Sequence, residues 1–211
     1  MNPASIVVQQ SPGRPEQLIL MFHGMGGAPE NLLPLGRRLA SAFPASTVVC
    51  IAAPNVSGTM GGREWFSAAG VTEENRLARV AAAMPAYLAE IRAWQKAADV
   101  TPAVTALVGF SQGAIMALES TQQAVPVSAH IVEIAGRFAS GPRVAPQSCR
   151  LHLLHGEADS VMPIALSIQA VETLRSLGAR ATLDRFPGLG HSIDARVGKR
   201  VIERIIERVG T

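Results

Sequence analysis

The sequence of 211 residues is 48% hydrophobic and 17% charged, a composition typical of globular chains that excludes an intrinsically disordered one. The formal net charge is only +3, and the Lys and Arg residues form no block, so the charge pattern does not indicate nucleic-acid binding. No apolar run approaches the roughly 20 residues that span a bilayer, and the first residues lack a secretory-signal pattern. We therefore expect a cytoplasmic protein without stable membrane insertion.

The length suits one domain, and we expect residues 1–211 to form it. Cys50 and Cys149 lie at the ends of apolar segments and lack the spacing of metal ligands. This pattern favours reduced, buried thiols and gives no reason to expect a metal site. The sequence is compatible with a monomer or a homodimer.

Short apolar runs bounded by Gly or Pro recur along the chain and predict β-strands. They cover residues 5–9, 18–22, 47–51, 104–110, 130–134, 151–154 and 181–186. Most of these runs are continuously apolar, which is typical of strands buried on both faces of a parallel sheet. The first run is the expected edge strand.

Segments with helical periodicity separate the predicted strands. They cover residues 31–43, 73–98, 164–177 and 195–209, with a shorter one at 114–119. Thr72 is the expected N-cap of the second helix, and Pro85 should kink or split that helix. The alternation predicts an α/β fold with a doubly wound, mostly parallel sheet of about seven strands. No stretch after Ser111 is long enough for a separate lid, so we expect no cap domain.

A Gly-x-Ser-x-Gly motif, centred on Ser111, lies between a predicted strand and a predicted helix. A serine at such a sharp turn adopts a strained backbone conformation, and the flanking glycines Gly109 and Gly113 avoid steric overlap. The turn holds the hydroxyl above the sheet, where it can act as a nucleophile. The motif alone is equally compatible with an ordinary strand-to-helix connection, so the rest of the site decides its meaning.

A serine nucleophile needs a base and an acid, which in α/β-hydrolases follow it along the chain as acid and then His. Asp159, in the loop after the run 151–154, is the candidate acid, with Glu157 as its rival and helix capping as its alternative role. His191, in a Gly-rich loop after the run 181–186, is the candidate base. An ordinary loop histidine is the alternative for His191.

An oxyanion hole requires two N–H donors, one of them from the residue after the nucleophile, which is Gln112. The second is expected in the Gly-rich loop 23–27 after an early strand, and the Met25 N–H is the candidate. A phosphate-binding turn is the alternative for this loop, but the Gly-Lys-Ser/Thr ending of such turns is missing. His23 is expected to organise the loop through hydrogen bonds.

Together these motifs resemble the phospholipase/carboxylesterase family, which includes the acyl-protein thioesterases, and they are most similar to its small bacterial carboxylesterases. The resemblance covers almost the whole chain. It rests on His23-Gly24-Met25-Gly26, Gly-Gly-Arg-Glu-Trp-Phe at 61–66, Gly-Phe-Ser-Gln-Gly-Ala at 109–114, His-Gly-Glu-Ala-Asp-Ser-Val-Met-Pro at 155–163, and Gly190-His191.

The resemblance implies an α/β-hydrolase fold, no cofactor, and hydrolysis of small-molecule carboxylic esters or thioesters. By position it assigns Ser111, Asp159 and His191 to the triad, Met25 and Gln112 to the oxyanion hole, and Trp65 and Phe66 to the surroundings of the acyl pocket. Core packing is the alternative for the two aromatic residues. Gly27 departs from the family pattern, because many members have an acidic residue there.

A carboxylesterase for short to medium acyl chains is the expected function. The alternatives are an acyl-protein thioesterase or lysophospholipase with the same triad, and a non-catalytic binding protein with a hydrolase fold. The intact Ser-Asp-His order argues against the binding protein, because a binder has no need of an activated hydroxyl.

Overall fold

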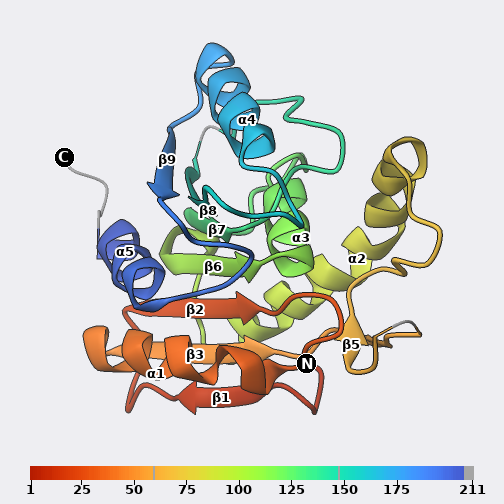
Figure 1. The fold of residues 1–211 in the computed structure, drawn as a ribbon. Helices are drawn as coiled ribbons and strands as arrows, with labels where there is room; N and C mark the ends of the chain where they lie inside the picture. The colour runs from red at the N-terminus through yellow and green to blue at the C-terminus, as the bar shows by residue number, and fades with distance from the viewer. Residues whose placement is uncertain (59, 147, 207–211) are drawn as a thin grey trace.

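A computed structural model describes residues 1–58, 60–146 and 148–206 and places a seven-stranded sheet at the centre of the molecule (Figure 1). The strands are β1 (Ile6–Gln9), β2 (Gln17–Phe22), β3 (Ser46–Ile51), β6 (Thr105–Phe110), β7 (His130–Ile134), β8 (Arg150–Gly156) and β9 (Ala181–Phe186). Their order in the sheet is β1-β3-β2-β6-β7-β8-β9. Only β1, at one edge, pairs antiparallel with its neighbour.

The sheet confirms the predicted doubly wound, mostly parallel topology, and every predicted strand is present. Several boundaries differ: β1 begins one residue later than predicted, and β2, β3 and β8 each begin one residue earlier. β6 begins one residue late because Pro102–Val104 form a 3-10 turn, and β8 continues two residues further, to Gly156. A short antiparallel ribbon, β4 (Asn55–Val56) with β5 (Arg63–Glu64), was not predicted, because strands of two residues show no hydrophobic period.

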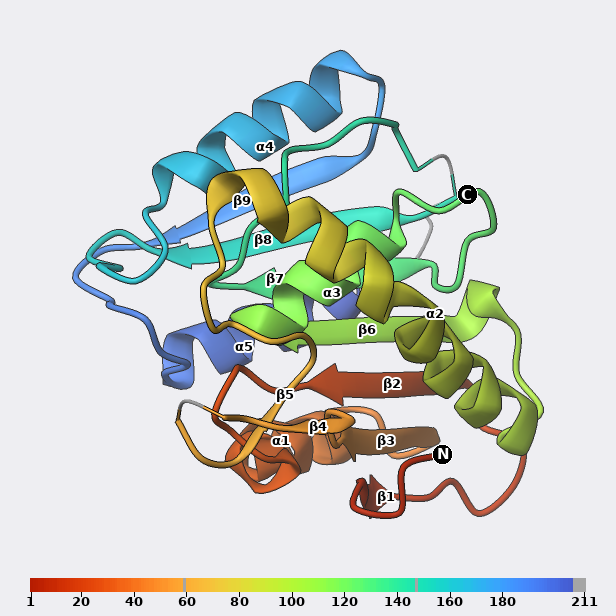
Figure 2. The ribbon, with the colours of Figure 1, turned by 90° about the vertical axis from the view of Figure 1, so that its right-hand side faces the viewer.

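Helices cover both faces of the sheet. They are α1 (Leu33–Ala42), α2 (Glu73–Ala97), α3 (Gln112–Ser120), α4 (Ala165–Ser176) and α5 (Ala195–Ile206), with a 3-10 turn at Pro29–Leu32 before α1. Figure 2 shows α2, α3 and α4 in front of the sheet, where they share one hydrophobic core. The helices α1 and α5 pack on the opposite face around a second core. Among the described residues, no helix is long and apolar enough to cross a lipid bilayer.

The helix α2 corrects one expectation about Pro85. The helix runs unbroken from Glu73 to Ala97 with the proline inside it, so the prediction of a split is wrong. Met84 and Leu88, on either side of the proline, are buried in the core, and this packing stabilises the helix where proline removes a backbone hydrogen bond. The predicted N-cap is confirmed, since the Thr72 side chain accepts the Asn75 N–H.

The last helix is observed to Ile206, and its predicted end at Val209 lies outside the described residues. The side chain of Asp194 accepts the N–H of Val197 at 2.9 Å and so caps the first turn.

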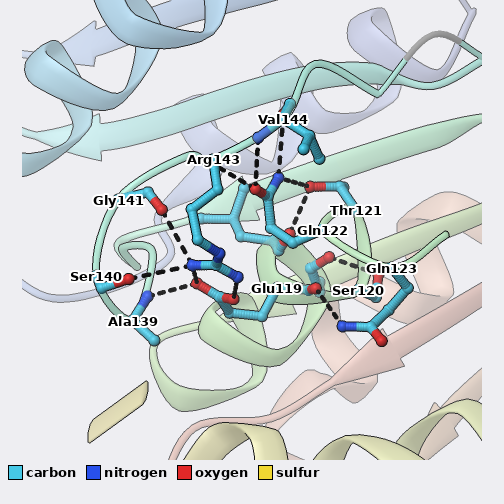
Figure 3. Close-up of polar contacts among 12 residues, drawn as sticks. Glu119, Ser120, Thr121, Gln122, Gln123, Ala139, Ser140, Gly141, Arg143 and Val144 are labelled. Atoms are coloured by element: carbon cyan, nitrogen blue, oxygen red, sulfur yellow. Dashed lines mark hydrogen bonds and ion pairs between the residues drawn. The ribbon is translucent and has the colours of Figure 1, made fainter.

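The connection from β7 to β8 is, in its described part, a loop bound to α3. The buried carboxylate of Glu119 pairs with Arg143 at 2.5 Å and also accepts the N–H of Ala139 (Figure 3). The Gln122 side chain accepts the N–H groups of Arg143 and Val144. These contacts fix the loop against the body of the protein, and no cap domain covers the sheet edge within the described residues.

Candidate active site

The serine of the Gly-x-Ser-x-Gly motif lies at the turn between β6 and α3. Ser111 has φ 53° and ψ −116°, a left-handed conformation that costs a non-glycine residue about 1–3 kcal/mol. Its N–H donates to the Ile134 carbonyl at 3.0 Å, which connects the turn to the neighbouring strand β7. The predicted strained turn is therefore present.

The two glycines of the motif are required by close backbone contacts. A Cβ on Gly109 would lie 2.6 Å from the Cα of Ala114, and a Cβ on Gly113 would overlap with the carbonyl group of Phe22. No side chain fits either position without a backbone shift. The contact at Gly113 also brings the start of α3 against the end of β2, where the Gly-rich loop begins.

The structure brings Ser111, His191 and Asp159 together from three loops at the carboxyl edge of the sheet. His191 Nε2 lies 2.9 Å from Ser111 Oγ, and His191 Nδ1 lies 2.7 Å from Asp159 Oδ2. Because a carboxylate only accepts, Nδ1 carries the proton in the neutral ring and Nε2 is free to accept from the serine hydroxyl. This is the geometry that a serine nucleophile and its base require.

Asp159 is buried and its two carboxylate oxygens contact four partners. Its Oδ1 accepts the N–H groups of Val161 and Met162 at 2.8 and 2.9 Å, while Oδ2 faces His191 and also lies 3.4 Å from His155 Nε2. Burial by itself raises the pKa of Asp159, but the bonds from Met162, His191 and Val161 outweigh it and hold that pKa below 3.8. The carboxylate is therefore charged at neutral pH.

His155 is a supporting residue that sequence reasoning passed over. Its fully buried ring donates from Nε2 to the Met162 carbonyl at 2.7 Å, and its Nδ1 bonds Ser167 Oγ at 2.8 Å. Burial lowers the pKa of His155, so the ring is neutral and holds the Asp159 loop in place without adding charge. The position of His155 four residues before Asp159 was the signal from which a supporting role could have been predicted. The rival acid, Glu157, instead pairs with Arg185 at 2.8 Å.

The Gly-rich loop follows β2 and faces the serine. A Cβ on Gly24 would lie 3.2 Å from Ser111 Cβ, so the backbone of this loop lies directly beside the nucleophile turn. Met25 and Gln112 line the same cavity as Ser111. Within the described chain, no backbone or side-chain acceptor takes the N–H of either residue.

His23 organises this loop, as the sequence suggested. Its Nδ1 donates to the Gly24 carbonyl at 2.7 Å and its Nε2 accepts the Ala53 N–H at 3.1 Å, so both ring nitrogens are occupied. At Gly27, where many family members carry an acidic residue, a Cβ would lie 2.9 Å from Asn31 Oδ1. Any side chain at this position would displace Asn31, which accepts the Ala28 N–H at the start of the next turn.

The aromatic pair divides between two roles. Phe66 lines the cavity beside Ser111, whereas Trp65 is a core residue and does not line it. The Trp65 ring packs on Phe22 and Tyr87 with centroid distances of 5.4 and 5.5 Å, and its indole N–H donates to the His23 carbonyl. The expectation of a substrate-facing pair therefore needs correction for Trp65, because the strand register directs its ring into the core.

The side chain of Gln112 fixes the loop that carries this pair. Its Oε1 accepts the Trp65 N–H at 2.8 Å, and its Nε2 donates to the Phe66 carbonyl at 2.8 Å. The residue after the serine thus binds the cavity wall through its side chain, while its backbone N–H has no acceptor among the described residues. The sequence predicted only the backbone role.

The cavity next to Ser111 has a volume of about 560 Å³. Its wall is mainly apolar, with Phe66, Ile115, Met162 and Leu166 among its members, and it also includes three charged side chains: Glu73, Arg76 and Arg137. A second cavity of about 420 Å³ is lined by His191, Phe110 and the Gly-rich loop, and Met25 lines both cavities.

Comparison with known proteins places the chain in a family. Residues 3–206 match the model of the phospholipase/carboxylesterase family. Esterase YpfH of Escherichia coli (strain K12) is 44% identical over 190 residues, which are 90% of this chain and 82% of that protein. The crystal structure of esterase PE8 superposes with a TM-score of 0.85 at 29% identity and covers 98% of this chain and 99% of its own.

Acyl-protein thioesterase 2 of Zea mays shares the fold, with a TM-score of 0.76 at 20% identity over 98% of this chain and 99% of its own. The sequence match spans nearly all of the described residues and includes every loop of the site. The chain therefore belongs to the phospholipase/carboxylesterase family and is an ester-hydrolysing serine hydrolase.

Proposed function

We propose that this protein is a carboxylesterase for short to medium acyl chains, in which Ser111 is the nucleophile, His191 the base and Asp159 the orienting acid. The observation that carries the proposal is the unbroken series of hydrogen bonds from Asp159 Oδ2 through the imidazole to Ser111 Oγ. It begins at a charged, buried carboxylate and ends at a hydroxyl on a strained turn. Such a series activates a hydroxyl that is otherwise a weak nucleophile.

Acyl transfer proceeds in two steps. His191 Nε2 takes the Ser111 proton as the hydroxyl attacks the acyl carbon, and the charged imidazole is stabilised by Asp159. The N–H groups of Met25 and Gln112 donate to the oxyanion that forms, and each such donor lowers the barrier by about 3 kcal/mol. His191 then protonates the leaving alcohol, and water releases the acid from the acyl-enzyme by the same route.

The two cavities suggest where the parts of the ester bind. The leaving group must reach His191, which lines the smaller cavity and not the larger one. The acyl chain therefore belongs in the larger cavity, against Phe66, Ile115 and Leu166. Apolar side chains there favour an apolar acyl group, since burial of each methylene contributes about 0.8 kcal/mol.

Three charged residues in the acyl cavity favour short to medium chains. Glu73, Arg76 and Arg137 form an ion-paired cluster with a net positive charge at this wall, and a long alkyl chain that covers the cluster would remove that charge from water without offering it a partner. An acyl-protein thioesterase or a lysophospholipase with the same triad remains the alternative, and chain-length preference distinguishes it. The active-site geometry argues against a binding protein without turnover.

The test is a series of nitrophenyl esters from acetate to palmitate, with Ser111→Ala as the blank. Ser176→Ala is the matched control, because Ser176 is exposed near the end of α4, away from the site. We expect serine-dependent turnover with the highest kcat/KM at short to medium chains. A maximum at palmitate would move the assignment to lipid or acyl-protein substrates, and equal turnover by Ser111→Ala would overturn the mechanism.

A further inference from the structure

The acyl cavity contains an ion cluster that the proposed mechanism does not use. Arg76, in the first turn of α2, places Nη1 2.6 Å from Glu73 Oε2. Arg137, in the loop after β7, binds both oxygens of the same carboxylate, at 2.9 and 2.8 Å. All three side chains line the cavity that also contains Ser111. The cluster thus joins two elements that lie 64 positions apart in the sequence, at the wall of the proposed acyl site.

The charges in this cluster are unequally exposed. The Glu73 side chain is 63% exposed, whereas the side chains of Arg76 and Arg137 are only 14% and 16% exposed. Two guanidinium groups and one carboxylate leave a net charge of +1 at the cavity wall. The two arginines hold the pKa of Glu73 at about 2, so the carboxylate is charged at neutral pH. The excess positive charge therefore lies on the two largely buried arginine side chains.

The donors of the two arginines are not all occupied. Arg137 uses Nε on the Phe138 carbonyl and both Nη atoms on Glu73. Arg76 contacts Glu73 through Nη1 alone, and within residues 1–58, 60–146 and 148–206 no acceptor binds its Nε or Nη2. The nearby Arg79 is different, because its guanidinium donates to three loop carbonyls and does not line the cavity.

We propose that Arg76 and Arg137 bind a carboxylate at the far end of the acyl chain, so that the preferred substrates are monoesters of dicarboxylic acids. This inference rests on the proposed function, because it places the acyl chain in the cavity next to Ser111. The ester carbonyl lies at the serine, the methylene chain covers Phe66 and Leu166, and the free carboxylate neutralises the surplus positive charge.

The chemistry of the wall favours this class of substrate. A guanidinium group presents paired donors that match a carboxylate, and hydrogen bonds between charged partners are about twice as strong as neutral ones. A partly buried cation with unused donors gains most from an anion that arrives with the ligand. A neutral chain of equal length would leave these donors unpaired, and an ammonium group would be repelled. Charge at the chain end should therefore set specificity.

The reaction to follow is the hydrolysis of ethyl esters by one water molecule, which releases ethanol and the acid, measured by titration of the acid. Three substrates have chains of matched length and differ in terminal charge: monoethyl adipate, ethyl hexanoate and ethyl 6-aminohexanoate. We expect kcat/KM for the adipate monoester to exceed that for the hexanoate by about tenfold, mainly through KM. The amine should be the poorest substrate.

Two variants of Arg76 test whether the preference for adipate over hexanoate arises at the cavity wall. Arg76→Gln should reduce the preference for adipate over hexanoate to about twofold, because kcat/KM for adipate falls much more than kcat/KM for hexanoate, and Arg76→Lys should restore part of the preference. Arg92→Gln is the matched control, since Arg92 is an exposed residue of the same helix that does not line the cavity. It removes the same charge and should leave the preference unchanged.

The failure of this inference is distinguishable from failure of the proposed function. Equal kcat/KM for adipate and hexanoate, with both activities lost in Ser111→Ala, would overturn the carboxylate site and leave the esterase assignment intact. A parallel loss on both substrates in Arg76→Gln would also overturn it, because the arginine would then only support the cavity wall. Absence of any Ser111-dependent turnover would instead refute the esterase mechanism itself.

Discussion

Asp159 lies 2.7 Å from His191 through one carboxylate oxygen, while its other oxygen accepts two backbone N–H groups from its own loop. The bonds within the loop hold the carboxylate in a fixed orientation, independently of its contact with the imidazole. The imidazole is therefore oriented by a group that cannot rotate away. The same bonds keep the carboxylate charged, which is the state that stabilises an imidazolium.

Replacing Asp159 with Asn should lower kcat by a factor of about 10⁴ with little change in KM. The amide preserves the shape of the acid but cannot stabilise the charged imidazole, and its NH₂ group favours the tautomer in which Nε2 no longer accepts from Ser111. Steady-state kinetics on the best nitrophenyl ester measures the effect.

Glu157→Gln is the control for this prediction. Glu157 is in the same loop but pairs with Arg185 on β9, so its loss should leave kcat within about twofold of wild type. Equal losses of kcat in the two variants would show that catalysis depends on the intact loop and not on the carboxylate of Asp159.

Gly113→Ala should destabilise the protein by about 3 kcal/mol, because the new Cβ overlaps with the Phe22 carbonyl and neither strand nor helix can move freely. Gly13→Ala is the matched control, since a Cβ there meets nothing within 4 Å. Urea unfolding of the two variants tests the difference. Unfolding midpoints that agree with each other would contradict the proposed close contact between β2 and α3.

A buried carboxyl on β7 makes stability depend on pH. Glu133 is fully buried, and its Oε1 accepts the Gly136 N–H, while Oε2 has no hydrogen-bond partner among the described residues. Burial raises the pKa of Glu133 from 4.5 to about 8, and the charge of Asp159 adds to the shift. The side chain is therefore protonated at neutral pH in the folded protein.

Glu133→Gln should remove one source of instability at high pH. Between about pH 4.5 and about pH 8 the folded state holds a proton that the unfolded state has released, so rising pH favours unfolding across this window. Glutamine imitates the neutral acid and still accepts from Gly136. The free energy of unfolding should thus fall less with pH in the variant than in the wild type.

Urea denaturation at about pH 5 and about pH 9 measures this difference. Glu172→Gln, which removes an exposed carboxylate from α4, should follow the wild-type curve. Parallel curves for Glu133→Gln and wild type would contradict the raised pKa.

The sheet and the three candidate catalytic residues were accessible to prediction because each depends on local patterns. Continuous apolar runs identify buried parallel strands, and the carboxyl ends of such strands meet at one edge, so loops that follow them share a site. Ser111, Asp159 and His191 each follow a strand, which is why sequence order alone suggested their proximity.

Other features depend on contacts between distant segments and were not predictable. The register of the segment 63–66 decides that Trp65 enters the core while Phe66 faces the cavity, and no periodicity marks so short a strand. The bidentate pair between Glu73 and Arg137 likewise has no local signature. The predicted split at Pro85 does not occur because tertiary packing, which propensity does not include, compensates for the missing N–H of the proline.

Covalent labelling tests the central claim most directly. The purified protein is treated with a fluorophosphonate while ester hydrolysis is followed, and the modified peptide is then identified by mass spectrometry. We expect one adduct on Ser111, formed in proportion to the loss of activity, and no adduct in Asp159→Asn on the same timescale. Complete inactivation with the adduct on another residue, or full activity after Ser111 is labelled, would contradict the account.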